Sequence, residues 1–254
     1  MANGRGWDQT MSASQRTRSV FFTVAATTAL IVGAVAGPIA AAYADDGCAD
    51  VEVVFARGTN EAPGVGATGQ AFVDALTAEL PGKTVDVYGV NYPASLNFSQ
   101  AVDGVADASN RIQAIAAQCP ATKIVLGGYS QGAAVAGYTT AGAVPAGFSL
   151  PAGISGPMPA SIASHVAAVA LFGTPDDWFL SLVDRDAPPI TIGQLYSAKA
   201  IQLCATGDPV CFPGGLTRSA HSSYKDNGMV VQAAVFAARQ LGGESAAAAM
   251  ETAS

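Results

Sequence analysis

The sequence predicts an α/β fold with a central, mainly parallel sheet of about five strands and helices on both faces. Short apolar runs alternate along the chain with longer stretches in which apolar residues recur at helical spacing. Runs such as 124–126 and 166–172 are apolar at every position, which is typical of parallel strands covered on both faces. Strands separated by helices in this order favour an α/β architecture.

The individual elements follow from the same pattern. Residues 51–56 form the first expected strand, and the helix expected at 70–80 carries Phe72, Leu76 and Leu80 on one face. This strand-then-helix unit recurs towards the C-terminus. The expected strands are 51–56, 84–90, 123–127, 166–172 and 199–203, and the expected helices are 70–80, 100–118, 131–143 and 229–241.

Two segments do not fit this scheme. Residues 143–161 are rich in proline and glycine, which indicates a surface excursion between a helix and the next strand. Residues 242–254 are small and polar without a periodic apolar face, so we expect a flexible C-terminal tail. The intervening residues 45–241 are expected to form one domain.

The N-terminal segment has the order of a secretory signal peptide. Arg16 and Arg18 precede an apolar run over 20–36, and Ala42-Tyr43-Ala44 supplies a small-residue cleavage site. The alternative is an uncleaved membrane anchor, but the 17-residue run is shorter than the roughly 20 residues that a spanning helix needs. We expect residues 1–44 to be removed after Ala44, whether translation starts at Met1 or Met11. The mature protein is then secreted, without a transmembrane span; whether it stays near the cell envelope is left open.

The charge of the remaining chain argues against nucleic acid as a partner. Residues 1–44 hold 3 of the 12 basic residues and 1 of the 19 acidic residues, which leaves 9 and 18 and a formal charge of −9. Such a surface repels polyanions at long range and supports solubility. The 210 residues from 45 onwards suffice for one complete core, and we expect a monomer.

Four cysteines, all beyond residue 44, predict two disulfides in an exported protein. Three pairings are available. Cys204 and Cys211 flank a short segment of turn-forming residues, which favours their pairing and leaves Cys48 with Cys119. A metal site is disfavoured because the chain has only two histidines, and no metal or organic cofactor is expected.

The segment Gly128-Tyr129-Ser130-Gln131-Gly132 carries the strongest chemical signal. It follows an apolar strand and opens a helix of small residues, which is the setting of the nucleophile elbow in α/β-hydrolases. A side chain at position 128 or 132 would crowd so sharp a turn. Ser130 is therefore the predicted nucleophile.

A serine hydroxyl needs a base, and only His165 and His221 are available. Elbow hydrolases place nucleophile, acid and base in that order along the chain, so His221 is the predicted base. His165 precedes the strand at 166–172, and we interpret it as a solvated loop residue. Asp208 is the predicted acid because it follows the strand at 199–203 and lies between Cys204 and Cys211. The other acidic candidates are interpreted as turn residues: Asp176, Asp177, Asp184 and Asp186.

From Cys48 to Leu241 the chain resembles the cutinases and the bacterial secreted cutinase-like esterases. Four motifs carry the resemblance: Ala56-Arg57-Gly58-Thr59-Asn60-Glu61, the elbow at 128–132, Cys204-x3-Asp208-x2-Cys211 and Ala220-His221-x2-Tyr224. The resemblance implies a cutinase-like α/β-hydrolase fold and a triad of Ser130, Asp208 and His221. It also implies disulfides Cys48–Cys119 and Cys204–Cys211, and an oxyanion hole made by Thr59 and the backbone N–H of Gln131.

Two departures from the family pattern bear on the substrate. Thr59 stands where fungal cutinases carry serine, so a methyl group is added beside the expected acyl site. The excursion at 143–161 is longer than in the fungal enzymes, and whether it covers the site is open. Cutin itself is therefore a weak guess for the substrate.

The expected function is hydrolysis of a small-molecule or lipid carboxylic ester through an acyl-enzyme. Phe212, Pro213 and Leu216 lie between Asp208 and His221, where the resemblance places the family's binding loop, and so suggest an aliphatic acyl site, unless they serve only to pack. The alternatives are a lipase, phospholipase or acyltransferase with the same triad, or a non-catalytic secreted module of binding or antigen type.

Overall fold

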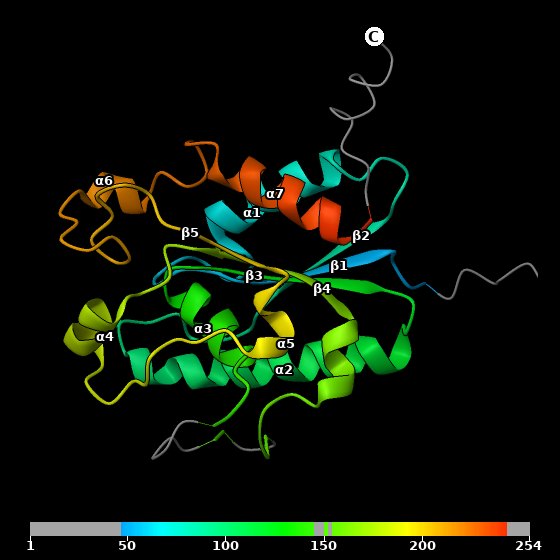
Figure 1. Cartoon of the computed structure of the whole chain (residues 1–254), viewed down its shortest axis with the longest axis horizontal. Coiled ribbons are helices and arrows are strands. Elements are labelled where there is room, and N and C mark those ends of the chain that lie inside the picture. The colour runs from blue at the N-terminus through cyan, green and yellow to red at the C-terminus, as the bar shows by residue number, and fades with distance from the viewer. Residues whose placement is uncertain (1–46, 145–149, 152–153, 243–254) are drawn as a thin grey trace, which may run out of the picture. The chain divides into compact units, whose positions relative to one another are not determined.

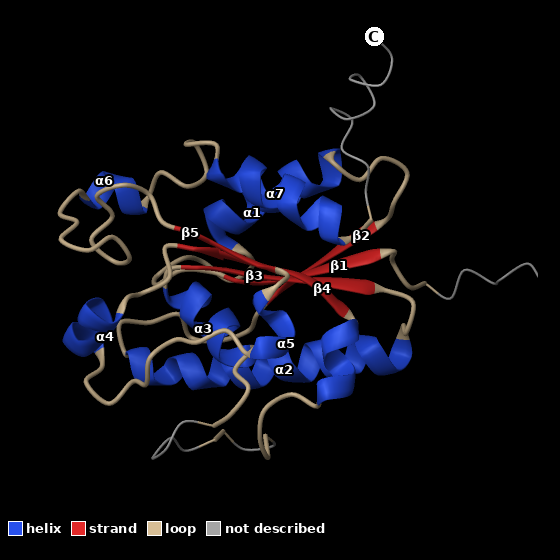
Figure 2. Ribbon diagram, in the orientation of Figure 1, coloured by secondary structure: helices blue, strands red, loops and turns tan. Residues whose placement is uncertain are grey.

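The computed structural model describes residues 47–144, 150–151 and 154–242, which belong to one compact unit. Its centre is a five-stranded sheet with the order β2-β1-β3-β4-β5, in which every neighbouring pair is parallel (Figure 2). The strands are β1 (Val51–Ala56), β2 (Val85–Gly89), β3 (Lys123–Tyr129), β4 (Val166–Phe172) and β5 (Ala200–Leu203). The predicted parallel sheet is thus confirmed.

Helices cover both faces of the sheet, as predicted. One face carries α1 (Gly66–Ala78) and α7 (Met229–Gln240), which pack side by side (Figure 1). The other face carries α2 (Ala101–Gln118), α3 (Gln131–Thr139) and the short α5 (Gln194–Ser197).

Two hydrophobic cores hold the helices to the sheet. On the α1 and α7 face the fully buried rings of Phe55, Phe72 and Phe172 lie with their centroids 5.8–6.3 Å apart. On the other face Ile112 of α2 packs with Leu126 of β3. Burial of each such side chain contributes about 1.5–3 kcal/mol, so the sheet is a rigid platform for the loops at its edge.

Two helix boundaries, the start of α1 and the end of α3, differ from the prediction by four residues each, for local reasons. Helix α1 starts at Gly66 rather than at residue 70, because the Glu61 carboxylate accepts a hydrogen bond from the Ala67 N–H at 2.8 Å and satisfies a first-turn amide. Helix α3 ends at Thr139 rather than at 143. The hydroxyls of Thr139 and Thr140 bond back to carbonyls within the last turns, and Gly142 disfavours a further turn.

Sequence patterns missed the short helical segments. These are α4 (Asp177–Val183), α5, α6 (Arg218–His221) and the 3₁₀ turns η1 (Phe98–Gln100) and η2 (Ala160–Ser164). Most are too short to show a helical period. For α4 a signal did exist, because Asp176 accepts a hydrogen bond from the Phe179 N–H at 2.7 Å as an N-cap. The interpretation of Asp176 as a turn residue is therefore wrong.

The sheet topology identifies where a site belongs. Strand order reverses between β1 and β3, so the loops that leave their carboxyl ends diverge and open a crevice. Among the described residues, the non-glycine residues with positive φ are Asn60, Ala94 and Ser130. They lie on the loops after β1, β2 and β3, and backbone strain of this kind gathers at functional sites.

The expected signal peptide and most of the expected tail, residues 243–254, lie outside the described residues. Of the excursion, residues 145–149 and 152–153 lie outside as well. Within the described ranges, no helix is long and apolar enough to cross a membrane.

Candidate active site

Ser130 lies at the sharp turn between β3 and α3, with φ 55° and ψ −120°. Its N–H donates to the Phe172 carbonyl at 2.8 Å, which ties the turn to β4. A Cβ atom at position 128 would lie 2.1 Å from the Gly132 carbonyl oxygen, and one at position 132 would lie 2.0 Å from that of Ala56. Both glycines are therefore required by close backbone contact, and the turn holds the serine at the carboxyl edge of the sheet.

His221 joins Ser130 to Asp208. Its Nε2 lies 2.9 Å from Ser130 Oγ, and its Nδ1 lies 2.9 Å from Asp208 Oδ2. The histidine is the last residue of α6, and Asp208 lies on the loop that follows β5. Three residues far apart in the sequence thus form one hydrogen-bonded chain whose geometry suits proton transfer from the serine hydroxyl.

The Asp208 carboxylate is completely buried and fully hydrogen-bonded. Oδ2 also accepts from the Tyr224 hydroxyl at 2.6 Å, and Oδ1 accepts from the Val210 N–H at 2.8 Å. Burial acts to raise the pKa of Asp208, but the hydrogen bonds from His221, Tyr224 and Val210 outweigh it and hold the pKa below its ordinary value. The carboxylate therefore stays ionised at neutral pH and holds one orientation.

Two tyrosines hold the histidine and the aspartate in position. Tyr224, itself fully buried, accepts from the Ala205 N–H at 3.0 Å while it donates to Asp208. Burial and the bond to Asp208 raise the pKa of Tyr224, so its hydroxyl remains a donor. Tyr129 donates to the His221 carbonyl at 2.6 Å, and its ring lies 5.1 Å from the imidazole. Both tyrosines stand in the motifs quoted from the sequence, but the motifs alone assigned neither of them a role.

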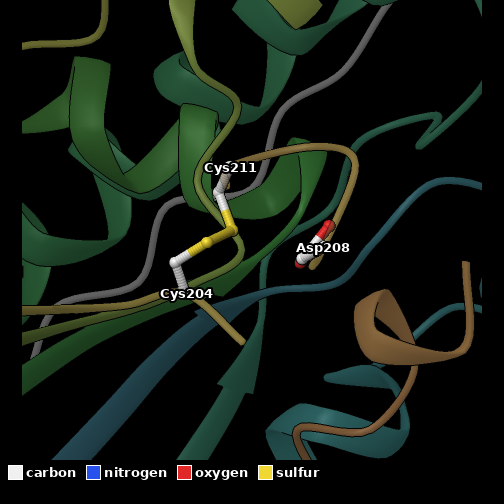
Figure 3. A group of neighbouring side chains, drawn as sticks. All are labelled: Cys204, Asp208 and Cys211. Atoms are coloured by element: carbon white, nitrogen blue, oxygen red, sulfur yellow. A yellow bond between two sulfur atoms is a disulfide. The ribbon is translucent and has the colours of Figure 1, made fainter. Parts of the chain in front are cut away.

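The two disulfides lie in different parts of the fold and have the expected pairing. Cys204–Cys211 closes the loop that carries Asp208 (Figure 3), and Cys211 Sγ lies 3.4 Å from the Tyr224 hydroxyl. Cys48–Cys119 ties the segment before β1 to the end of α2. Cys204, Asp208 and Cys211 are close enough to suggest metal ligands, but sulfurs joined in a disulfide are not thiolates, so the group does not suit a metal ion.

The two predicted oxyanion donors also lie beside Ser130. Thr59 is half-buried on the loop after β1 and lines a pocket together with Ser130. Gln131 begins α3, where first-turn amides have no partner inside the helix and the helix dipole favours negative charge. The fully buried Gln131 side chain donates to the Ser95 carbonyl at 2.9 Å, which anchors the loop before η1.

The pocket at Ser130, called here the serine pocket, has a volume of about 260 Å³. Apart from Thr59, Tyr129, Ser130 and His221, its lining is apolar and consists of Leu96, Phe98, Phe179, Val183 and Val210. The residues expected at the acyl site do not line it: Phe212 and Leu216 are 40% and 88% exposed, and Pro213 is exposed as well. Most of the apolar lining comes instead from η1 and α4, two elements that the sequence pattern did not reveal.

Other predicted features lie away from this site. His165 precedes β4 and so lies at the amino edge of the parallel sheet, whereas Ser130 lies at the carboxyl edge. The histidine is half-buried rather than solvated, and its buried Nδ1 has no hydrogen-bond partner among the described residues. Asp184 accepts from the Asp186 N–H at 3.2 Å, as expected of a turn aspartate. The described residues of the 143–161 excursion line a separate cavity against α2 and α3, and none lines the serine pocket.

Comparisons with known proteins give a consistent result. The family model described as Cutinase matches residues 47–241. "Carboxylesterase Culp1" of Mycobacterium tuberculosis is 49% identical over 219 residues, 86% of this chain and 93% of the relative. "Phospholipase Culp4" of the same organism is 44% identical over 230 residues, 91% and 93% of the two chains. A solved Trichoderma reesei cutinase in complex with a phosphonate inhibitor is 32% identical with a TM-score of 0.56, covering 76% of this chain and 77% of its own.

Proposed function

Because the chain belongs to the cutinase family and is a carboxylic ester hydrolase, as its relatives are, we propose that Ser130, His221 and Asp208 are its catalytic triad. One observation carries the proposal: the continuous hydrogen-bonded chain from Ser130 Oγ through the imidazole to the buried Asp208 carboxylate. Elsewhere in the described ranges, the remaining histidine lies at the opposite edge of the sheet.

The reaction proceeds in two half-reactions. Ser130 Oγ attacks the ester carbonyl carbon while His221 Nε2 takes the hydroxyl proton, and Asp208 stabilises the imidazolium that results. As the tetrahedral intermediate collapses, the C–O bond to the alcohol breaks and His221 gives the proton to the departing oxygen. Water then enters, loses a proton to His221 and attacks the acyl-enzyme, and the released acid leaves Ser130 with its proton restored.

The negative charge on the carbonyl oxygen is stabilised on the Thr59 side of the serine. The Gln131 N–H is available at the start of α3, and the Thr59 hydroxyl supplies a second donor from the loop after β1. The acyl group enters the apolar serine pocket. Its lining by Leu96, Phe98 and Phe179 favours an aliphatic chain over a polar one.

A phospholipid ester is a second candidate substrate. Trp178 and Leu182 on α4 and Leu96 beside the serine pocket are 59%, 62% and 77% exposed, so apolar side chains face solvent near the mouth. A relative of 44% identity is named a phospholipase. Analysis of the products released from phosphatidylcholine vesicles distinguishes the two, because a phospholipase releases a fatty acid and a lysolipid.

We also propose that the protein acts outside the cell after cleavage behind Ala44. The signal-like order of residues 16–44 supports export, and the two disulfides suit an oxidising compartment. N-terminal sequencing of the protein recovered from culture medium tests this, and a first residue other than Asp45 contradicts the cleavage site.

The two histidines provide the test of the catalytic assignment. His221→Ala should lower kcat for p-nitrophenyl butyrate by about 10⁴-fold or more, because removal of a triad member leaves only binding and oxyanion stabilisation. His165→Ala is the matched control, since it removes the same side chain at the other edge of the sheet, and it should keep most of its turnover. Comparable losses in both variants would refute the assignment of the base.

A further inference from the structure

A second pocket lies beside the serine pocket, on the face of the sheet that carries α2 and α3. It has a volume of about 370 Å³ and lies between the start of α2, the middle of α3 and the end of α4. Val102, Ala134 and Leu180 give it an apolar wall, and Asp184 and Asp186 lie at the end formed by the loop after α4. We call it the helix pocket, and the reaction proposed above does not use it.

The two pockets share one wall. The Phe98 side chain lines both of them. On α4, Phe179 lines the serine pocket and the next residue, Leu180, lines the helix pocket. The rings of Phe98 and Phe179 meet edge to face with centroids 6.3 Å apart. A single aromatic pair therefore lies at the junction between the space beside Ser130 and the helix pocket.

We propose that the helix pocket receives the distal methylenes of a long, unbranched acyl chain whose carbonyl lies at Ser130, with Phe98 at the junction. This inference rests on the proposed function and deepens it. A chain that begins in an apolar pocket and continues past an aromatic edge into a second apolar space remains out of water along its length. Each buried methylene favours binding by about 0.8 kcal/mol, or roughly fourfold.

The acidic end of the helix pocket adds a second criterion for the acyl chain. Asp184 is half-buried and Asp186 is exposed. Burial, with a smaller effect from the negative charges of Asp184 and Asp177, raises the pKa of the neighbouring Tyr138 to about 12. A chain that ends in a methyl group meets no penalty there. A chain of equal length that ends in a carboxylate is repelled, because like charges meet in a partly desolvated space.

Acyl chain length tests the proposal directly. In the full chain, kcat/KM for p-nitrophenyl esters should rise from acetyl to dodecanoyl. Val102→Phe, which fills the helix pocket, should leave acetyl and butyryl turnover within twofold and lower dodecanoyl turnover at least tenfold. Val231→Phe is the matched control: it makes the same change in the first turn of α7, on the other face of the sheet, and should alter neither.

A second variant tests whether a loss of activity in Val102→Phe comes from misfolding. Ala187→Phe fills the helix pocket from the loop after α4 and should give the same selective loss with a native melting temperature. Asp184→Asn should raise turnover of an ester with an ω-carboxylate relative to its methyl-ended counterpart. Equal losses at every chain length in both filling variants, or a dependence on alcohol length instead of acyl length, would overturn the proposal. Absence of turnover of every p-nitrophenyl ester by the unmodified protein, whatever its acyl length, would instead overturn the proposed function.

Discussion

Two parts of the site around Ser130 are built in opposite ways. On the side of His221, every polar atom of the Asp208 carboxylate is bonded, the carboxylate is buried, and a disulfide closes the loop that carries it. In the serine pocket, which His221 and Val210 also line, most of the apolar side chains come from η1 and α4, and Leu96 is 77% exposed. The first side has a fixed geometry, and the second has an apolar surface with few directional contacts.

The difference suits what each side is proposed to do during the reaction. Proton transfer needs donor and acceptor atoms within hydrogen-bond distance and in one orientation, so small displacements are costly. Binding of an aliphatic chain depends on apolar area and tolerates changes of shape. Substitutions on the histidine side should therefore lower kcat, whereas substitutions in the pocket should alter the choice of substrate.

Thr59 lines the serine pocket but is predicted to stabilise the transition state. A substitution there should therefore lower kcat, unlike other substitutions in the pocket. Thr59→Val keeps the size of the side chain and removes the hydroxyl. If that hydroxyl donates to the oxyanion, kcat should fall by roughly 10²-fold, about 3 kcal/mol, with little change in KM. Steady-state kinetics with p-nitrophenyl butyrate measures both constants. A change confined to KM would make Thr59 a pocket wall only.

Removal of each disulfide should have a different effect, one on the position of Asp208 and the other on the stability of the fold. Cys204 and Cys211 are 7 residues apart and Cys48 and Cys119 are 71 apart. Chain entropy gives about 2.5 kcal/mol for the short loop and about 4 kcal/mol for the long one. The Cys204→Ala, Cys211→Ala variant should keep native circular dichroism at room temperature yet lose at least tenfold in kcat/KM, because the loop that orients Asp208 loosens.

The long-range disulfide is the control for that experiment. The Cys48→Ala, Cys119→Ala variant should lose melting temperature and keep its turnover while folded, because this bond lies away from the triad. If the short-loop variant melts early but turns over normally below its melting temperature, the bond is structural only. Asp208 is then positioned by Tyr224 and Val210 alone.

Tyr224→Phe should have a smaller effect on turnover and a pH signature. It removes one hydrogen bond to an ionised group, worth about 1.5–3 kcal/mol, and should lower kcat severalfold. The folded pKa of Asp208 is lowered, so its stabilising contribution is present above the unfolded pKa and is lost as pH falls through the folded value. The Tyr224→Phe variant should therefore have a lower free energy of unfolding than the unmodified protein at neutral pH. This difference should become smaller as the pH falls. A difference that does not change with pH would mean that Tyr224 contributes packing alone.

The sequence predicts the residues of the proposed triad but not the apolar lining of the serine pocket, and the reason is physical. Ser130, Asp208 and His221 are specific residue types in characteristic settings, and the structure brings them together. Phe98, Phe179 and Val183 need only be apolar, so no motif marks them. They also lie on helical segments of three and seven residues, too short for a clear period. Phe212, Pro213 and Leu216 lie between Asp208 and His221, where the resemblance places the binding loop, but of this stretch Val210 and His221 line the pocket and these three do not.

The sheet was more predictable than its loops. β1 and β4 have the predicted bounds, because apolar runs buried on both faces leave little ambiguity. The start of α1 depended on Glu61, which lies outside the helix and satisfies its first turn through a tertiary contact. Such contacts follow from the folded arrangement and leave no periodic trace.

Labelling with an active-site-directed fluorophosphonate tests the central claim most directly. The reagent forms a covalent bond only with an activated hydroxyl, so peptide mass spectrometry of the labelled full chain should place one adduct on Ser130. The rate of labelling should fall steeply in His221→Ala, remain near normal in His165→Ala, and vanish in Ser130→Ala. An adduct on another residue, or labelling of Ser130 that does not depend on His221, would contradict the proposed triad.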